Sequence, residues 1–101
     1  MQPLTREDSL ELIYGCLREI NAERLPRSPV QLTSETRVLG SGAELDSLEV
    51  VNLIVRLEGL LAHRFSRPVV LVDQGAFEDD GHPFENVATL ASFIVKKANR
   101  A

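Results

Sequence analysis

The chain has a single cysteine, Cys16, and no tryptophan among its 101 residues. One thiol excludes a disulfide within the chain and a zinc site built on several cysteines. No stretch approaches the roughly eighteen apolar residues that a membrane-spanning helix needs. Residues 1–8 contain acids where a signal peptide needs a basic and then an apolar run, so we expect a cytoplasmic protein.

Basic residues are also few, because 11 Lys and Arg stand against 15 Asp and Glu and leave a net charge of −4. That sign is wrong for binding a phosphate backbone, so we expect no nucleic-acid partner. With 101 residues, 44% of them apolar, the chain can form one small core but not a deep, enclosed active site. We therefore expect one domain over residues 1–101, with its core between about residues 5 and 98, and no enzymatic activity.

Apolar residues at helical spacing predict a first helix after Thr5, a candidate N-cap. The helix is expected to end within residues 22–25, and its buried face is expected to contain Leu10, Ile13, Leu17 and Ile20. Cys16 lies on the same stretch and is predicted to be a buried apolar side chain rather than a reactive thiol. Pro26 and Pro29 then predict a long, extended first loop.

The second helix has the strongest signal, because Asp46 is a candidate N-cap and Glu49 stands where a capping box needs an acid. Its predicted apolar stripe consists of Val51, Ile54, Leu57 and Leu61, and the stripe is widened by Val50, Leu53, Val55 and Leu60. A helix this apolar is expected to lie centrally and to touch every other element.

The remaining segments predict shorter elements around that helix. Residues 69–72 are β-branched but have no partner strand, so we expect an extended segment laid over the second helix. Residues 73–77 and 84–87 are candidates for single helical turns, and Thr89 is a candidate N-cap of a last helix lined by Leu90, Phe93, Ile94 and Ala98. The fold class is therefore all-α: three main helices, one or two short helices and a long first loop.

The motif that carries chemistry is Leu45-Asp46-Ser47-Leu48-Glu49. It puts a serine in the first turn of the second helix, where free amides and the helix dipole favour an attached anion such as a phosphodiester. A simpler interpretation is that the motif only caps the helix.

With its surroundings, the motif resembles that of the acyl carrier proteins, small helical bundles that carry acyl groups on 4′-phosphopantetheine. The similarity covers residues 5–98. It rests on the first helix at residues 6–22, Leu39-Gly40, the Asp46-Ser47-Leu48 motif, the helix from Val50 to Glu58, and the closing helix from Thr89 to Ile94.

The resemblance implies that a phosphopantetheinyl transferase modifies Ser47, with coenzyme A as donor and magnesium on the transferase side. Asp46 matches the acid beside the attachment serine. The thiol of the arm would hold acyl groups as thioesters, so Cys16 is not the working thiol. The partners implied are acyl- or amino-acid-activating and acyl-transferring enzymes, which would meet a monomeric carrier at Leu48, Glu49, Asn52, Val55, Arg56 and Glu58.

Three departures distinguish the chain from the carriers of housekeeping fatty acid synthesis. Residues 41–44 lengthen the attachment loop, Asn52 and Gly59 replace further acids of the second helix, and residues 69–87 are longer than the family's third-helix region. These departures favour a carrier of a specialised bacterial pathway of lipid or polyketide type. The acids of residues 44–62 (local balance −3) and 73–86 (local balance −5) are expected to face basic partner enzymes.

Two other functions remain open at this point: an aminoacyl or peptidyl carrier, and an unmodified helical interaction module. A hydrolase is disfavoured, because no Gly-x-Ser-x-Gly elbow is present. The interior is expected either to be packed shut or to part around an acyl chain, with a lining of Val51, Ile54, Leu71, Phe77 and Phe84.

Overall fold

The computed structural model describes residues 3–40, 42–66, 68–71 and 83–99. These residues form three helices, α1 (Arg6–Glu23), α2 (Ser47–Arg64) and α3 (Val87–Ala98), and contain no strand. The predicted all-α bundle with a long first loop is confirmed. The helical turn predicted at residues 84–87 was wrong: residues 83–85 form a turn and a bend, and Asn86 is extended as the N-cap of α3. The turn predicted at residues 73–77 lies outside the described residues. Over the described ranges, no helix has the length and apolar character needed to cross a membrane.

Each helix begins with a capping box. Thr5 and Asp46 cap α1 and α2, as the sequence predicts. The prediction for α3 was wrong, because Asn86 and not Thr89 is the N-cap. The Asn86 side chain accepts from the Thr89 amide at 2.8 Å, and the Thr89 hydroxyl accepts from the Asn86 amide at 3.1 Å. Thr89 thus takes the position that Glu or Gln usually occupies in a capping box, three residues inside the helix.

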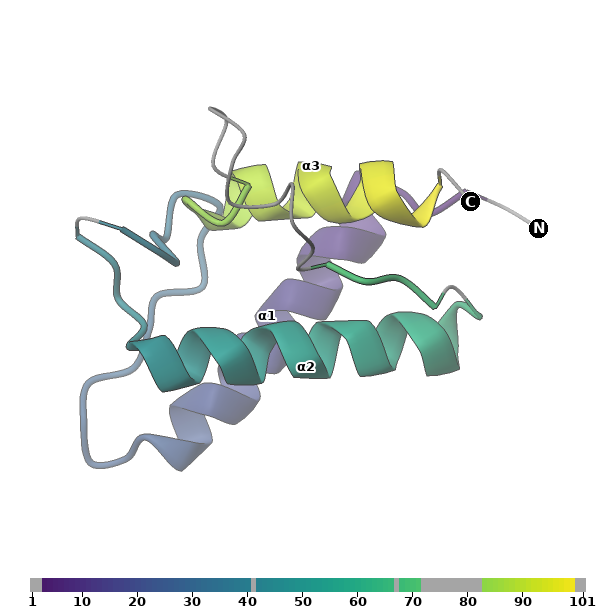
Figure 1. Cartoon of the computed structure of the whole chain (residues 1–101). Coiled ribbons are helices and arrows are strands. Elements are labelled where there is room, and N and C mark those ends of the chain that lie inside the picture. The colour runs from purple at the N-terminus through teal and green to yellow at the C-terminus, as the bar shows by residue number, and fades with distance from the viewer. Residues whose placement is uncertain (1–2, 41, 67, 72–82, 100–101) are drawn as a thin grey trace.

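Helix α1 packs against both of the other helices and crosses behind them in Figure 1. The expectation that the second helix is central was therefore wrong. The physical reason is that α1 buries a face that meets both of the other helices, and on this face the Ser9 hydroxyl donates to the Ala91 carbonyl of α3. This face consists of Ser9, Leu12, Ile13, Cys16, Leu17 and Ile20. Leu10, which was expected on the face, is only partly buried.

The buried side of α2 is also rotated relative to the predicted stripe. Leu57 and Leu61 are fully buried, as expected, but Val51 and Val55 are 54% and 61% exposed. Ile54 is only partly buried, and the core is completed by Val50 and Leu53. Because α2 has apolar residues on nearly every side, periodicity alone did not decide which side faces α1.

The first loop pairs with the entrance to α3, a contact that sequence patterning did not predict. The Val38 amide donates to the Glu85 carbonyl at 3.0 Å, and the Val87 amide donates to the Thr36 carbonyl at 2.9 Å. Arg37 and Asn86 form an isolated antiparallel bridge between these bonds. The loop is thereby attached to a segment some fifty residues further along the chain.

The segment after α2 lies against that helix, as expected. Leu71 is fully buried, and its amide donates to the Glu58 carboxylate at 2.7 Å. This contact confirms the predicted placement for residues 69–71, whereas Val72 lies outside the described residues.

Helices α1 and α3 are joined by polar contacts at two places. The buried Ser9 hydroxyl donates to the Ala91 carbonyl at 2.9 Å. The Asn99 side chain accepts from the Leu4 amide at 2.8 Å and donates to the Leu4 carbonyl at 2.9 Å. Leu4, which precedes the N-cap of α1, is therefore tied to the C-cap residue of α3.

Candidate functional site

The start of α2 presents Ser47 as an exposed residue in the first helical position. Asp46 directly before it accepts from the Glu49 amide at 2.8 Å, and Glu49 accepts in return from the Asp46 amide at 3.0 Å. The Val50 amide donates to the Asp46 carbonyl at 3.0 Å and closes the first turn. Ser47 is thus accessible to solvent, while the residues on either side of it hold the turn in place.

The Asp46 carboxylate is stabilised in its charged form. The hydrogen bond from the Glu49 amide lowers the pKa of Asp46 most, and Arg27 lowers it further. Partial burial opposes this shift but does not reverse it. Asp46 therefore keeps a negative charge beside Ser47 throughout the neutral range.

The loop that leads into this site turns at two glycines. Gly40 has a φ of 97° and Gly42 a φ of 79°, a left-handed region that glycine adopts without strain. The Ala43 amide donates to the Gly40 carbonyl at 3.1 Å, and the Glu44 amide donates to the Arg37 carbonyl at 3.0 Å. The loop thus makes a turn with its own hydrogen bonds before the chain reaches Asp46.

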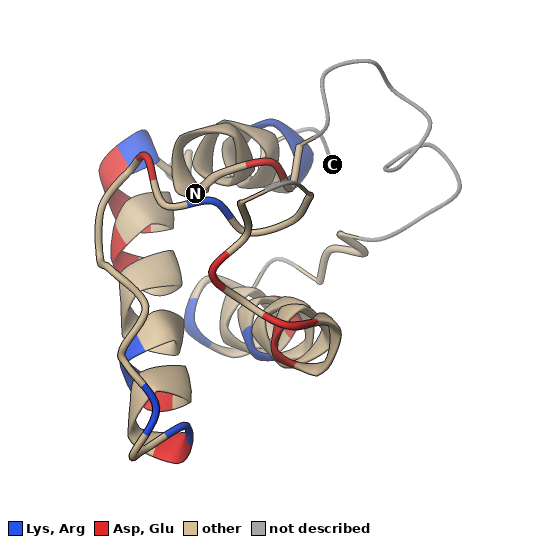
Figure 2. Ribbon diagram, turned by 90° about the vertical axis from the view of Figure 1, so that its left-hand side faces the viewer, with Lys and Arg blue, Asp and Glu red and all other residues tan. Residues whose placement is uncertain are grey.

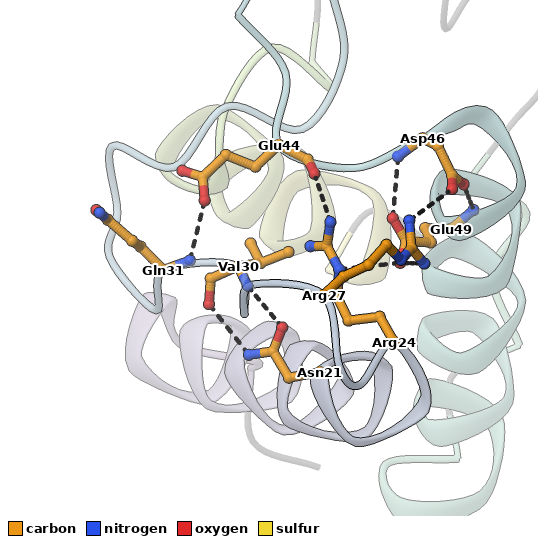
Figure 3. Close-up of polar contacts among 8 residues, drawn as sticks. All are labelled: Asn21, Arg24, Arg27, Val30, Gln31, Glu44, Asp46 and Glu49. Carbon is orange, nitrogen blue, oxygen red and sulfur yellow. Dashed lines mark hydrogen bonds and ion pairs between the residues drawn. The ribbon is translucent and has the colours of Figure 1, made fainter.

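Two arginines from the end of α1 and the following loop point toward the start of α2 (Figure 3). Arg27 lies 3.5 Å from an Asp46 carboxylate oxygen and 3.3 Å from Glu49 Oε2. Arg24 Nε lies 3.4 Å from the same Glu49 oxygen, and its Nη2 donates to the Glu44 carbonyl at 3.4 Å. We call Arg24, Arg27, Asp46 and Glu49 the arginine–acid cluster; its formal charges cancel.

Three residues predicted to recognise partners are engaged within the protein. Glu49 is 7% exposed and belongs to the arginine–acid cluster. Arg56 forms ion pairs with Glu19 and Glu23 of α1, which raise the pKa of its guanidinium, the Glu23 hydrogen bond most. Glu58 accepts from the Leu71 amide.

The outward side of α2 after Ser47 is apolar instead. Leu48, Val51 and Val55 are 71%, 54% and 61% exposed, and we call them the α2 apolar strip. Their spacing of three and four residues puts them on one face of the helix. Leu48 and Val55 were predicted to meet partners, whereas Val51 was predicted to line the interior. The sixth predicted residue, Asn52, is half-buried.

The acids of residues 44–62 all make contacts within the molecule. Besides the three acids described above, Glu44 accepts from the Gln31 amide at 3.1 Å. Figure 2 shows acidic and basic residues interspersed along α1. Of the more acidic stretch at 73–86, the described part includes Glu85, which lies 3.4 Å from Arg37. Sequence reasoning missed these partners because they are distant along the chain.

The residues expected to line an acyl-chain shelter do not share one environment. Leu71 and Phe84 belong to the buried core, Ile54 is partly buried and Val51 is exposed. Phe77 lies outside the described residues. The structure thus brings Leu71 and Phe84 into the core and leaves Val51 at the surface.

In the part of the chain that the structure describes, the cysteine, histidine and acidic side chains form no second candidate site. Cys16 is 1% exposed, as predicted, and burial raises the pKa of its thiol to about 11, with Glu19 adding to the rise and Arg56 opposing it. Among the described residues, no group of three or more His, Cys, Asp or Glu side chains is placed to hold a metal ion. His63 is exposed near the end of α2.

Comparison of the chain with protein-family models, with curated proteins and with solved structures found no match.

Proposed function

We propose that this protein is a carrier that holds acyl groups as thioesters on a 4′-phosphopantetheine arm attached to Ser47. The observation that supports this most is the position of Ser47, an exposed hydroxyl in the first turn of a firmly capped helix. A transferase can reach such a serine without unfolding the bundle. The resemblance of residues 5–98 to acyl carrier proteins points to the same residue.

The residues around Ser47 fit a phosphodiester. A helix start tolerates an anion because its amides and dipole are positive, and the neighbouring arginine–acid cluster adds no net charge. When bound, the arm would supply a thiol that forms the thioester. The chain's own contribution is to expose Ser47, to hold the first turn and to keep the buried Cys16 out of reach.

The α2 apolar strip lies directly after Ser47 and is the surface that we assign to partner enzymes. These are the phosphopantetheinyl transferase and the enzymes that load and unload the arm. From the three sequence departures described above, we further propose that the carrier serves a specialised bacterial pathway of lipid or polyketide type and works as a cytoplasmic monomer.

The test is the intact mass of the protein after incubation with coenzyme A, magnesium and a broad-specificity transferase. The wild-type protein should gain one phosphopantetheine group, and Ser47→Ala should gain none. Ser28→Ala, which changes another exposed serine in the first loop, is the matched control and should be modified like the wild type. An unmodified wild-type protein, or a Ser47→Ala protein that still gains mass, would refute the proposal.

Two alternatives share the same fold. The α2 apolar strip would also serve an unmodified interaction module, which the intact-mass experiment distinguishes by the absence of a mass gain. An aminoacyl or peptidyl carrier would be modified in the same way, so it is distinguished by its cargo. Incubating the modified protein with acyl- and amino-acid-activating enzymes should give an acyl thioester, and loading with an amino acid alone would favour the alternative.

A further inference from the structure

Glu49 has both carboxylate oxygens engaged inside the protein, and we propose that it positions Ser47 for modification rather than contacting a partner enzyme. Its Oε1 accepts from the Asp46 amide at 3.0 Å, and its Oε2 faces Arg24 and Arg27 at 3.4 and 3.3 Å. Because only 7% of its surface is exposed, Glu49 has little surface that a partner enzyme could contact. This inference rests on the proposed function, since it gives Glu49 a part in the modification of Ser47.

The two arginines are themselves held in place. Arg24 directly follows α1, and its amide donates to the Ile20 carbonyl at 3.0 Å. The Arg27 amide donates to the Arg24 carbonyl at 2.8 Å and fixes the turn between them. Beyond this turn, the Asn21 side chain bonds both the amide and the carbonyl of Val30, at 2.7 and 3.0 Å (Figure 3). These hydrogen bonds hold the backbone that carries the two guanidinium groups, and we call residues 24–30 the braced loop.

Glu49 joins this braced loop to the residues on both sides of Ser47. One oxygen completes the capping box with Asp46, and the other meets the arginines, so the first turn of α2 cannot shift without breaking both sets of contacts. A buried carboxylate is costly unless it is paired, and here the pairing is to groups of α1 and the first loop. The backbone position of Ser47 is thereby tied to α1.

The decisive variant is Glu49→Gln, because a glutamine at this position retains the capping box while removing the charge that the arginines face. With a transferase and coenzyme A, we expect kcat for Ser47 modification to fall about tenfold, with KM within about twofold of wild type, as misplacement of a nucleophile predicts. Amide hydrogen exchange of Glu49 and Val50 in the unmodified protein should become about tenfold faster as the first turn loosens.

Glu19→Gln is the matched control, since it neutralises an acid of a different ion pair between α1 and α2. It should leave kcat and the exchange of Glu49 and Val50 unchanged. Arg27→Gln guards against a folding defect in Glu49→Gln, because Arg27 is 56% exposed. In Arg27→Gln, kcat should fall and the exchange of the residue 49 and Val50 amides should rise, each by about threefold, because a half-exposed ion pair contributes less than a buried one.

Each outcome decides the proposal. A rise in KM with unchanged kcat in Glu49→Gln would show that Glu49 contacts the transferase, and would overturn the positioning role. Wild-type exchange at Glu49 and Val50 in both Glu49→Gln and Arg27→Gln would overturn it as well. A wild-type protein that is not modified at all would instead refute the proposed function, together with the part of Glu49 in modification.

Discussion

Burial decides what the reactive side chains of this protein are able to do. Cys16 and Glu49 carry groups that are reactive or charged, yet each lies almost entirely inside the molecule. Ser47, an ordinary hydroxyl, is exposed at a helix start. At this scale, motif spacing predicted the caps at Thr5 and Asp46, because capping is a local interaction. It did not predict the burial of Glu49, which depends on arginines more than twenty residues away.

The buried thiol of Cys16 should react slowly in the native protein. Its pKa is raised to about 11, so little thiolate forms near neutrality, and the core blocks access. In the unmodified protein at pH 8, a chromogenic disulfide reagent should label Cys16 at least about a hundredfold more slowly than in denaturant. Equal rates in the two conditions would show that the thiol is accessible.

The contribution of the Asp46 charge to stability should depend on pH. The pKa of Asp46 is lowered in the folded protein, chiefly by the Glu49 amide, so the charge stabilises the fold above the unfolded pKa. This contribution is lost as the pH falls below about 4 and through the folded pKa. Wild type should therefore unfold less readily than Asp46→Asn at pH 7, and chemical denaturation should show the difference closing toward pH 3. A difference that is constant with pH would contradict the assignment.

Helix α2 has two apolar sides that serve different purposes. One side is buried through Val50, Leu53, Leu57 and Leu61, and the other is the α2 apolar strip. The start and the helical nature of α2 could be predicted from the sequence, because a capping box and a 3.6-residue period are local signals. Which of its two apolar sides is buried could not be predicted, because that depends on how α1 packs against α2.

Substitutions on the two sides of α2 should differ sharply in their effect on stability. Leu53 is fully buried, so Leu53→Ala should lower the free energy of unfolding by about 2–5 kcal/mol, through lost burial and the cavity left behind. Val51 is 54% exposed, so Val51→Ala should change the free energy of unfolding by no more than about 0.5 kcal/mol. Urea denaturation of both variants measures this, and similar losses would mean that the helix is rotated from the described position.

At the scale of the whole molecule, α1 and the first loop bring together the ends of the other elements. The loop bonds to the entrance of α3 near Thr36 and Val38, and its start bonds to α2 through the arginine–acid cluster. The all-α class could be predicted because each helix is visible in its own stretch of sequence. The packing order could not, since it depends on contacts such as Val38 with Glu85 that leave no periodic signal.

The two bonds between Asn99 and Leu4 should contribute measurably to the stability of the bundle. Asn99→Ala removes both and leaves the part-buried Leu4 backbone groups without this partner, so we expect a loss of about 1–3 kcal/mol in the free energy of unfolding. Ser92→Ala changes an exposed residue of α3 and should stay within about 0.5 kcal/mol of wild type. Thermal and urea unfolding measure both variants, and an unaffected Asn99→Ala protein would contradict the role of this contact.

Attachment of the arm at Ser47 is tested most directly by locating the added group in the modified protein. Trypsin should release residues 38–56 as one peptide, which contains two serines, Ser41 and Ser47. Fragmentation of this peptide by tandem mass spectrometry should place the phosphopantetheine on Ser47. A group found on Ser41, on another peptide or on no peptide at all would contradict the proposal that Ser47 holds the carrier arm.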